Sequence, residues 1–215
     1  MMGTRMKGKV SVRWAMGAAL AASLLLSGCV SFGGKAPDQL ISLTPDVRAP
    51  AGEIGSGTIS AAMVVLDPDT DRRLDVTRVP VQIDKATIAY LKDAVWVEKP
   101  ARQFRRLMAE TLRVSLGEIV VEGSDYEVTG GTVLSGRLVD MGYDAREKSV
   151  IVRYDALLQD RKTGAVRSRR FEAEIPGVPA KAKAVAPALN EAANTVVGEV
   201  AEWIGEGAPD EDATG

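Results

Sequence analysis

Two kinds of side chain in this sequence could carry chemistry: a single cysteine, Cys29, and a set of aspartates. The sequence contains no histidine. Zinc sites of the usual histidine and cysteine type, and catalysis by Ser-His-Asp or Cys-His groups, are therefore excluded. A lone cysteine also cannot form a disulfide within the chain. Most familiar hydrolase and redox chemistry is therefore excluded, and Cys29 and the carboxylates are the candidates we consider.

The aspartates are plentiful, but their spacing does not select a catalytic pair. Those of interest lie on or near one predicted group of strands: Asp140, Asp144, Asp155 and Asp160. A glycosidase, for example, needs two acids roughly 5 to 10 Å apart in a cleft. Aromatic side chains that would line such a cleft are scarce, with three Trp in the chain. We predict no catalytic residue, no metal and no enzyme activity, and we keep a carboxylate-dependent hydrolase as a distant alternative.

The first 28 residues have the composition of a secretory signal peptide. Residues 1–13 carry four basic side chains and no acid, and an apolar run follows from Trp14 to Leu26. As a helix this 13-residue run would rise about 20 Å, which is less than the roughly 30 Å of a bilayer core. We therefore expect residues 1–28 to be a cleaved signal rather than a permanent membrane span.

The end of this segment, Leu26-Ser27-Gly28-Cys29, resembles the lipobox of bacterial lipoproteins. The resemblance implies that Leu26, Ser27 and Gly28 are recognised by the signal peptidase, which cuts before Cys29. It also implies that Cys29 carries a diacylglyceryl group on sulfur and an acyl group on nitrogen, with no other cofactor. In lipoproteins of the enterobacterial type, an aspartate after the cysteine signals inner-membrane retention. Val30 in that position implies the periplasmic face of the outer membrane.

Removal of the signal changes the charge of the chain. Residues 1–28 contain four basic residues and no acidic ones, so the formal net charge falls from −2 to −6. A negative chain of this kind is not expected to bind nucleic acid. We divide the sequence into a signal peptide at 1–28, a lipidated cysteine and linker at 29–38, a folded domain at 39–205 and an acidic flexible tail at 206–215.

Alternating and helical hydrophobic patterns predict the elements of the folded domain. Strands are expected at 40–43, 61–67, 74–84, 87–96 and 119–121, and a three-stranded antiparallel meander at 132–176. Helices are expected from Pro100 to Gly117 and over 182–204. These elements predict a single α+β domain. Its sheet should be mostly antiparallel or mixed, with about five to seven strands, and the two amphipathic helices should pack on one face.

Three prolines have specific consequences for these elements. Pro100 suits the first position of a helix, where its missing N–H would have no partner. Pro80 predicts an edge position or a bulge in its strand. Pro187 lies either in the first turn of the last helix or at a kink in it.

Three arginines on one predicted strand form a candidate partner surface: Arg167, Arg169 and Arg170. On a strand, Arg167 and Arg169 point the same way, and Phe171 follows them in phase. One interpretation is a solvated strand face opposite Glu172 and Glu174. The other is a docking surface for an acidic partner.

Tyr90, Trp96 and Pro100 form the most distinctive group in the sequence, at a strand end that runs into a helix. The stretch from Ile88 to Pro100 resembles the "Tyr … Trp-x-x-x-Pro, then helix" signature of ABC-type transport auxiliary lipoproteins, the PqiC-like family. The lipobox, the meander and the final helix with Trp203 occur in the same order. The resemblance covers about residues 26–204. Tyr90, Trp96, Pro100 and Trp203 are expected to be structural residues of the family pattern.

The resemblance implies a role in moving phospholipid between two membranes. Family members act with Mce-type (MlaD-like or PqiB-like) periplasmic proteins and with a permease and ATPase, so this chain would dock and position rather than catalyse. Exposed edge strands would also permit a homo-oligomer. The alternative from another class is a structural lipoprotein of a secretion or lipopolysaccharide assembly machine. The distant alternative, a carboxylate-dependent hydrolase, would act in the periplasm.

Overall fold

A computed structural model describes residues 3, 39–52, 55–123 and 131–207 of the chain. The elements follow one another as η1 (Ile59–Ala61), β1 (Met63–Leu66), β2 (Arg78–Gln82), β3 (Ile88–Val95), α2 (Pro100–Leu116), β4 (Val120–Gly123), β5 (Thr132–Asp144), β6 (Ser149–Asp160), β7 (Val166–Ile175) and α3 (Ala182–Gly205). Within these ranges, seven strands form one sheet.

Strand β5 organises the sheet, because it pairs along both of its edges. On one edge it pairs with β6 along its whole length in the antiparallel sense, and β6 pairs with β7 in the same way. On the other edge, the start of β5 runs parallel to β1 and its end runs parallel to β2. Strands β4 and β3 then extend the sheet beyond β1 and β2. The sheet is therefore mixed; β3 and β4 lie along one edge and β7 lies at the other.

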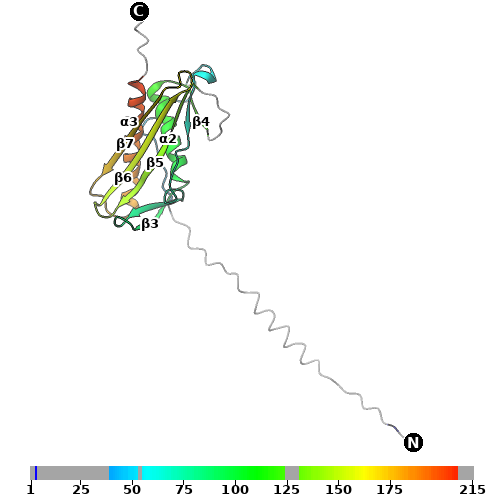
Figure 1. The fold of residues 1–215 in the computed structure, drawn as a ribbon. Coiled ribbons are helices and arrows are strands. Elements are labelled where there is room, and N and C mark those ends of the chain that lie inside the picture. Colours follow the sequence, from blue (N-terminus) through cyan, green and yellow to red (C-terminus); the bar gives the residue numbers. More distant parts are fainter. Residues whose placement is uncertain (1–2, 4–38, 53–54, 124–130, 208–215) are drawn as a thin grey trace, which may run out of the picture. The chain divides into compact units, whose positions relative to one another are not determined.

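Both helices pack on one face of this sheet, so the predicted α+β fold class is confirmed (Figure 1). Alternate residues of β6 are buried beneath the helices: Val150, Val152, Tyr154, Ala156 and Leu158. Aromatic contacts join the two layers. Phe104 of α2 lies 5.1 Å from Tyr154, and Phe171 of β7 lies 5.6 Å from Trp203 of α3, measured between ring centroids. The opposite face of the sheet carries no helix in the described part of the chain.

The helix ends follow the predicted signals. Pro100 is the first residue of α2, and Gly117 ends the helix in the left-handed conformation, with φ of 65°. Glycine adopts that conformation without the cost that a Cβ atom imposes. Helix α3 continues past Pro187, which is its sixth residue and is exposed to solvent.

Two predicted strands differ from the structure. The strand expected at 40–43 is reduced to one bridge between Ile41 and Trp96. The strand expected at 74–84 begins only at Arg78, because Leu74 belongs to a turn closed by its N–H donating to the Asp71 carbonyl at 3.1 Å. Leu74 is nevertheless fully buried. Its hydrophobic side chain therefore correctly predicted a core position, although the residue is not part of a strand. Pro80 lies at an irregularity in the β2–β3 pairing, as expected, while β3 takes the edge.

Candidate functional site

The first described segment of the domain, residues 39–49, is here called the strap, because it crosses from the end of β3 onto the helices. Beside β3 it is held by a short parallel ladder. The Ile41 N–H donates to the Val95 carbonyl at 2.8 Å, and the Val97 N–H donates to the Ile41 carbonyl at 2.9 Å. The ladder places the beginning of the strap next to the start of α2.

Side chains of both helices hold the rest of the strap. Each accepts a backbone N–H from an irregular segment that has no strand partner for it, so these bonds satisfy groups that would otherwise rely on water. The four bonds, at 2.7 to 3.0 Å, join Leu43 to Gln103, Thr44 to Asn190, Asp46 to Asn194 and Ala49 to Glu110. The strap is therefore fixed to α2 and α3 together. Nothing in the spacing of these polar residues identified them from the sequence.

The family-pattern residues lie in the core or next to it. Trp96 is 1% exposed and belongs to the main core cluster. Pro100 is buried at the first turn of α2. Tyr90 is half-buried, and the Arg78 guanidinium lies over its ring at 4.3 Å. Trp203 is buried between Phe171 and the Arg167 guanidinium, which lies 4.9 Å from its ring. These contacts link the ends of strands to the helices that follow or cover them.

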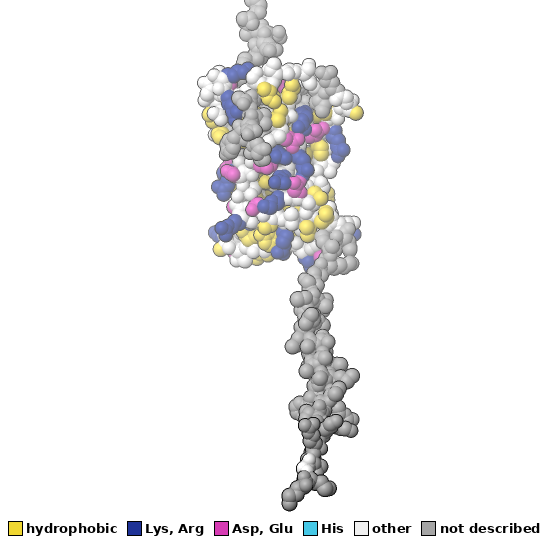
Figure 2. All heavy atoms as spheres, turned by 90° about the vertical axis from the view of Figure 1, so that its right-hand side faces the viewer, with side chains coloured by type: hydrophobic (Ala, Val, Ile, Leu, Met, Phe, Trp, Pro, Cys, Tyr) yellow, Lys and Arg dark blue, Asp and Glu magenta, His cyan; other side chains and the backbone are white. Residues whose placement is uncertain are grey.

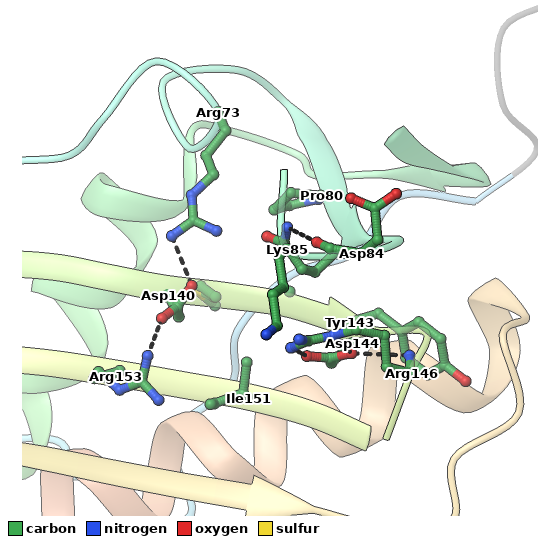
Figure 3. Close-up of a pocket in the computed structure, with 13 residues that line it drawn as sticks. Arg73, Pro80, Asp84, Lys85, Asp140, Tyr143, Asp144, Arg146, Ile151 and Arg153 are labelled. Carbon is green, nitrogen blue, oxygen red and sulfur yellow. Dashed lines mark hydrogen bonds and ion pairs between the residues drawn. The ribbon is translucent and has the colours of Figure 1, made fainter. Parts of the chain in front are cut away.

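A polar pocket of about 400 Å³ lies on the sheet face away from the helices. Asp140 of β5 occupies its centre between two arginines, Arg73 from the β1–β2 connection and Arg153 from β6 (Figure 3). Arg73 donates to the Asp140 carboxylate at 2.6 Å and also to the carbonyl of Val139. Arg153 pairs in addition with Glu172 of β7. The result is a chain of charges that crosses three strands and one connection.

The other aspartates considered as catalytic candidates are also paired or hydrogen-bonded. The Arg146 side chain beside Asp144 and backbone N–H groups lower the pKa of that carboxyl. Arg170 lowers the pKa of the Asp155 carboxyl in the same way, and its guanidinium group donates a hydrogen bond to that carboxylate at 2.7 Å. In the β6–β7 turn, the N–H groups of Thr163 and Lys162 lower the pKa of Asp160. A general acid needs a carboxyl that stays protonated near neutral pH, and these aspartates have the opposite tendency.

The three β7 arginines do not form one patch. Arg167 and Arg169 lie on the helix side of the sheet, where their guanidinium groups cover the rings of Trp203 and Phe171. Arg170 lies on the opposite face and forms its ion pair with Asp155. The alternation of a strand accounts for this separation. It leaves Arg170 beside the chain of charges around Asp140, a neighbourhood that the sequence did not reveal.

A second group of ion pairs ties α2 to the β1 and β4 edge. Arg105 lies 3.2 Å from Asp67 and 3.4 Å from Glu122, and Arg113 lies 2.9 Å from Glu122. Figure 2 shows the side of the domain that carries β4 in Figure 1, with acidic and basic side chains intermingled across its middle and hydrophobic groups gathered at either end. This surface has no dominant sign of charge.

Several predicted features fall outside these observations. The lipobox residues Leu26, Ser27, Gly28 and Cys29 lie outside the described residues. Within the described ranges, no cluster of three or more acidic or cysteine side chains could hold a metal ion. Neither helix in those ranges has the length and apolar character needed to cross a bilayer.

Known structures share this architecture. A crystal structure of an uncharacterized protein aligns with a TM-score of 0.59 at 14% identity, covering 77% of this chain and 99% of the other. A Xanthomonas campestris protein assigned to the family DUF330 aligns with a TM-score of 0.59 at 18% identity, covering 78% of this chain and 92% of its own. At these identities the likeness concerns the fold. No curated protein sequence matches the chain significantly.

The sequence itself matches a family model. The model for the ABC-type transport auxiliary lipoprotein component matches residues 42–201, which include the strap after Ile41, every strand and most of α3. This match confirms the predicted family resemblance; it includes Tyr90, Trp96 and Pro100 and ends two residues before Trp203. The chain therefore belongs to the family of ABC-type transport auxiliary lipoprotein components.

Proposed function

We propose that this protein is a lipoprotein of the outer membrane that docks and positions the periplasmic part of an intermembrane lipid transport system. The family match over residues 42–201 carries the proposal, because the family is defined as an auxiliary lipoprotein of ABC-type transport. The lipobox-like sequence ending at Cys29 supports attachment by acyl chains on that residue. Two or three acyl chains bury enough CH₂ groups, at about 0.8 kcal/mol each, to anchor a protein stably.

The mechanism is anchoring and positioning. The lipid on Cys29 holds the chain at the bilayer, the linker of residues 30–38 sets its reach, and the folded domain presents a rigid surface to its partner. We infer that the partner is an Mce-type periplasmic protein, associated with a permease and an ATPase that supply the energy. A homo-oligomer of this chain would fit the sheet edge formed by β7, which pairs only with β6 among the described strands.

The sheet face that carries Asp140 is the partner surface we favour. It is free of helices in the described part of the chain, and its charged side chains are already held in place by ion pairs. Arginine in a fixed orientation loses little freedom when it binds a partner, which favours specific docking. Arg170 is the most exposed arginine of this group.

Anchoring is tested with Cys29→Ala, compared with Ser31→Ala as a control two residues away. Cells are grown with labelled palmitate and separated into soluble and membrane fractions. The parent and the Ser31→Ala variant should be labelled and sediment with the outer membrane, whereas Cys29→Ala should carry no label and leave that fraction. Equal labelling and sedimentation of Cys29→Ala would contradict the proposal.

Docking is tested by capture from detergent extracts, with Arg170→Glu compared with its neighbour Arg169→Glu. The two side chains are both exposed but lie on opposite faces of β7. The parent should recover an Mce-domain protein, Arg170→Glu should lose most of it, and Arg169→Glu should retain it. Recovery of secretion or lipopolysaccharide assembly proteins in its place would favour the alternative envelope machine.

A further inference from the structure

We propose that one end of the domain rests on the phospholipid surface to which the chain is anchored. This end is here called the rim and consists of the β2–β3 connection, β3, Leu40 and Val97. The inference depends on the proposed lipidation of Cys29 and adds to it the orientation of the domain. It is drawn from the length of the linker, from where the strap begins, and from the side chains exposed around that point.

The linker is short compared with the domain. Nine residues separate Cys29 from Gln39, and a flexible chain of that length spans about 15 to 18 Å on average. The thirteen residues of β5, by contrast, extend over about 40 Å. The end of the domain where the strap begins is therefore kept near the bilayer, while the other end reaches the bilayer only if the domain lies flat.

The strap begins at the rim. The backbone of Ile41 forms hydrogen bonds with Val95, the last residue of β3, and with Val97, two positions further along the chain. β3 pairs with β2, and β2 pairs with the last residues of β5, Tyr143 and Asp144. The rim therefore lies at the carboxyl end of β5, and Figure 1 shows β3 at the end of the domain away from η1. The tethered end and the rim are the same part of the molecule.

The rim exposes apolar side chains near both ends of β3. Ile41 and Trp96 face the core, so the alternating neighbours Leu40 and Val97 face outward, and each is 53% exposed. At the other end of β3, Ile83 and Ile88 are also exposed. Four of the nine exposed large hydrophobic side chains in the described residues therefore lie on the rim. Scattered exposed hydrophobic residues are ordinary, but this concentration lies where the chain is tethered.

Amphipathic side chains lie between these two apolar ends. Tyr90 presents a half-buried ring beneath Arg78, and Lys92 and Asp93 are exposed beside it. Tyrosine and the long basic residues suit the headgroup region, where an apolar stem meets a polar boundary. Because the charges are mixed, the contact does not depend on anionic lipid. A tether also raises the local concentration of bilayer to the millimolar range, so a weak contact is enough to orient the domain.

The orientation is tested by photo-crosslinking of the full lipidated protein in vesicles of phosphatidylethanolamine and phosphatidylglycerol. A benzophenone amino acid is placed at rim positions 88 and 97 and at control positions 157 and 166. The controls are matched in exposure: Ile88 and Leu157 are both 41% exposed, and Val97 and Val166 are 53% and 55% exposed. Leu157 lies on the sheet, and Val166 lies at the end of the domain away from the rim.

Lipid adducts, measured by intact mass, should be at least about threefold more frequent at positions 88 and 97 than at their matched controls. A smaller ratio on protein that carries its lipid would overturn the orientation while leaving the anchoring proposal intact. Absence of lipid on Cys29, seen in the same mass spectra, would overturn both. Thermal unfolding of each purified variant checks that the exposed substitutions leave the fold unchanged.

Discussion

At the scale of single residues, the side chains that make this sequence recognisable are structural. Trp96 and Trp203 are buried, and Pro100 begins a helix, so none of the three is available to a ligand. The charged groups near Asp140 are instead accessible, but each has an arginine or carboxylate partner. Trp96, Pro100 and Trp203 are therefore separate from the charged residues that could meet a partner.

Tyr154 provides a prediction at this scale. Burial raises the pKa of its phenol above the ordinary value, and its O–H donates to the Ser135 carbonyl at 2.9 Å. In the unfolded chain the same phenol ionises near pH 10, so above that pH the unfolded state binds fewer protons than the folded state. The free energy of unfolding should then fall as pH rises, by up to about 1.4 kcal/mol per pH unit from this group.

The variant Tyr154→Phe removes this contribution. Urea unfolding should show a shallower loss of stability above about pH 10 than in the parent, although the variant is less stable near pH 7 by about 1 kcal/mol for the lost hydrogen bond. Between pH 7 and 9 the two proteins should show parallel pH dependence, which serves as the internal control. Identical slopes above pH 10 would contradict the assignment.

At the scale of elements, the strap joins parts that the sequence places far apart. Asn190 and Asn194 of α3 bind backbone groups more than 140 positions earlier in the chain, and Gln103 and Glu110 of α2 bind others. The strap therefore joins the two helices to each other and lies where the proposed tether would enter the domain. Under the proposed function, the strap links the lipid anchor to the docking surface.

Asn194→Ala tests the strap. The amide of Asn194 accepts the Asp46 N–H and donates to the Thr44 carbonyl, at 3.0 and 2.9 Å. Its loss should reduce the free energy of unfolding by about 1 to 2 kcal/mol and speed amide exchange in the strap. The neighbouring Thr195→Ala is the control, because the Thr195 hydroxyl bonds only within α3, to the Glu191 carbonyl. Unchanged exchange in Asn194→Ala would show that the strap is held by other contacts.

At the scale of the whole domain, one core joins the helices to the sheet. Trp96 lies beside the end of β3 and Trp203 lies near the end of α3, yet both belong to the same cluster of buried residues. The sheet is covered on one face by helices, and the other face, which we propose for docking, carries no helix in the described residues. The rim is at one end of this sheet, so the proposed tether and orientation leave the charged face clear of the bilayer.

A single core predicts cooperative unfolding of the folded domain. In Cys29→Ser protein that lacks residues 1–28, Trp96 and Trp203 are the remaining tryptophans. Their fluorescence and the far-ultraviolet circular dichroism should change at the same urea concentration, as expected for a two-state domain. Two separate transitions would mean that the strap and α2 unfold independently of the meander and α3.

The sequence by itself determined the elements whose signals are local. Pro100 and Gly117 mark the ends of α2, and the alternation in 149–160 predicts β6 because each buried residue is two positions from the next. The family resemblance also followed from residues near one another in sequence, from Tyr90 to Pro100. The lipidation of Cys29 and the docking partner remain predictions.

Tertiary structure decided what depends on distant residues. The sequence pattern predicted a strand at Leu74, because a buried hydrophobic residue gives the same local signal in a turn as in a strand. The structure shows that Leu74 is buried but lies in a turn bonded to Asp71. The pairing of β5 with both β1 and β2, the bonds from the strap to α2 and α3, and the position of Asp140 between Arg73 and Arg153 all join separate segments. Such contacts depend on chain topology, which local residue patterns do not encode.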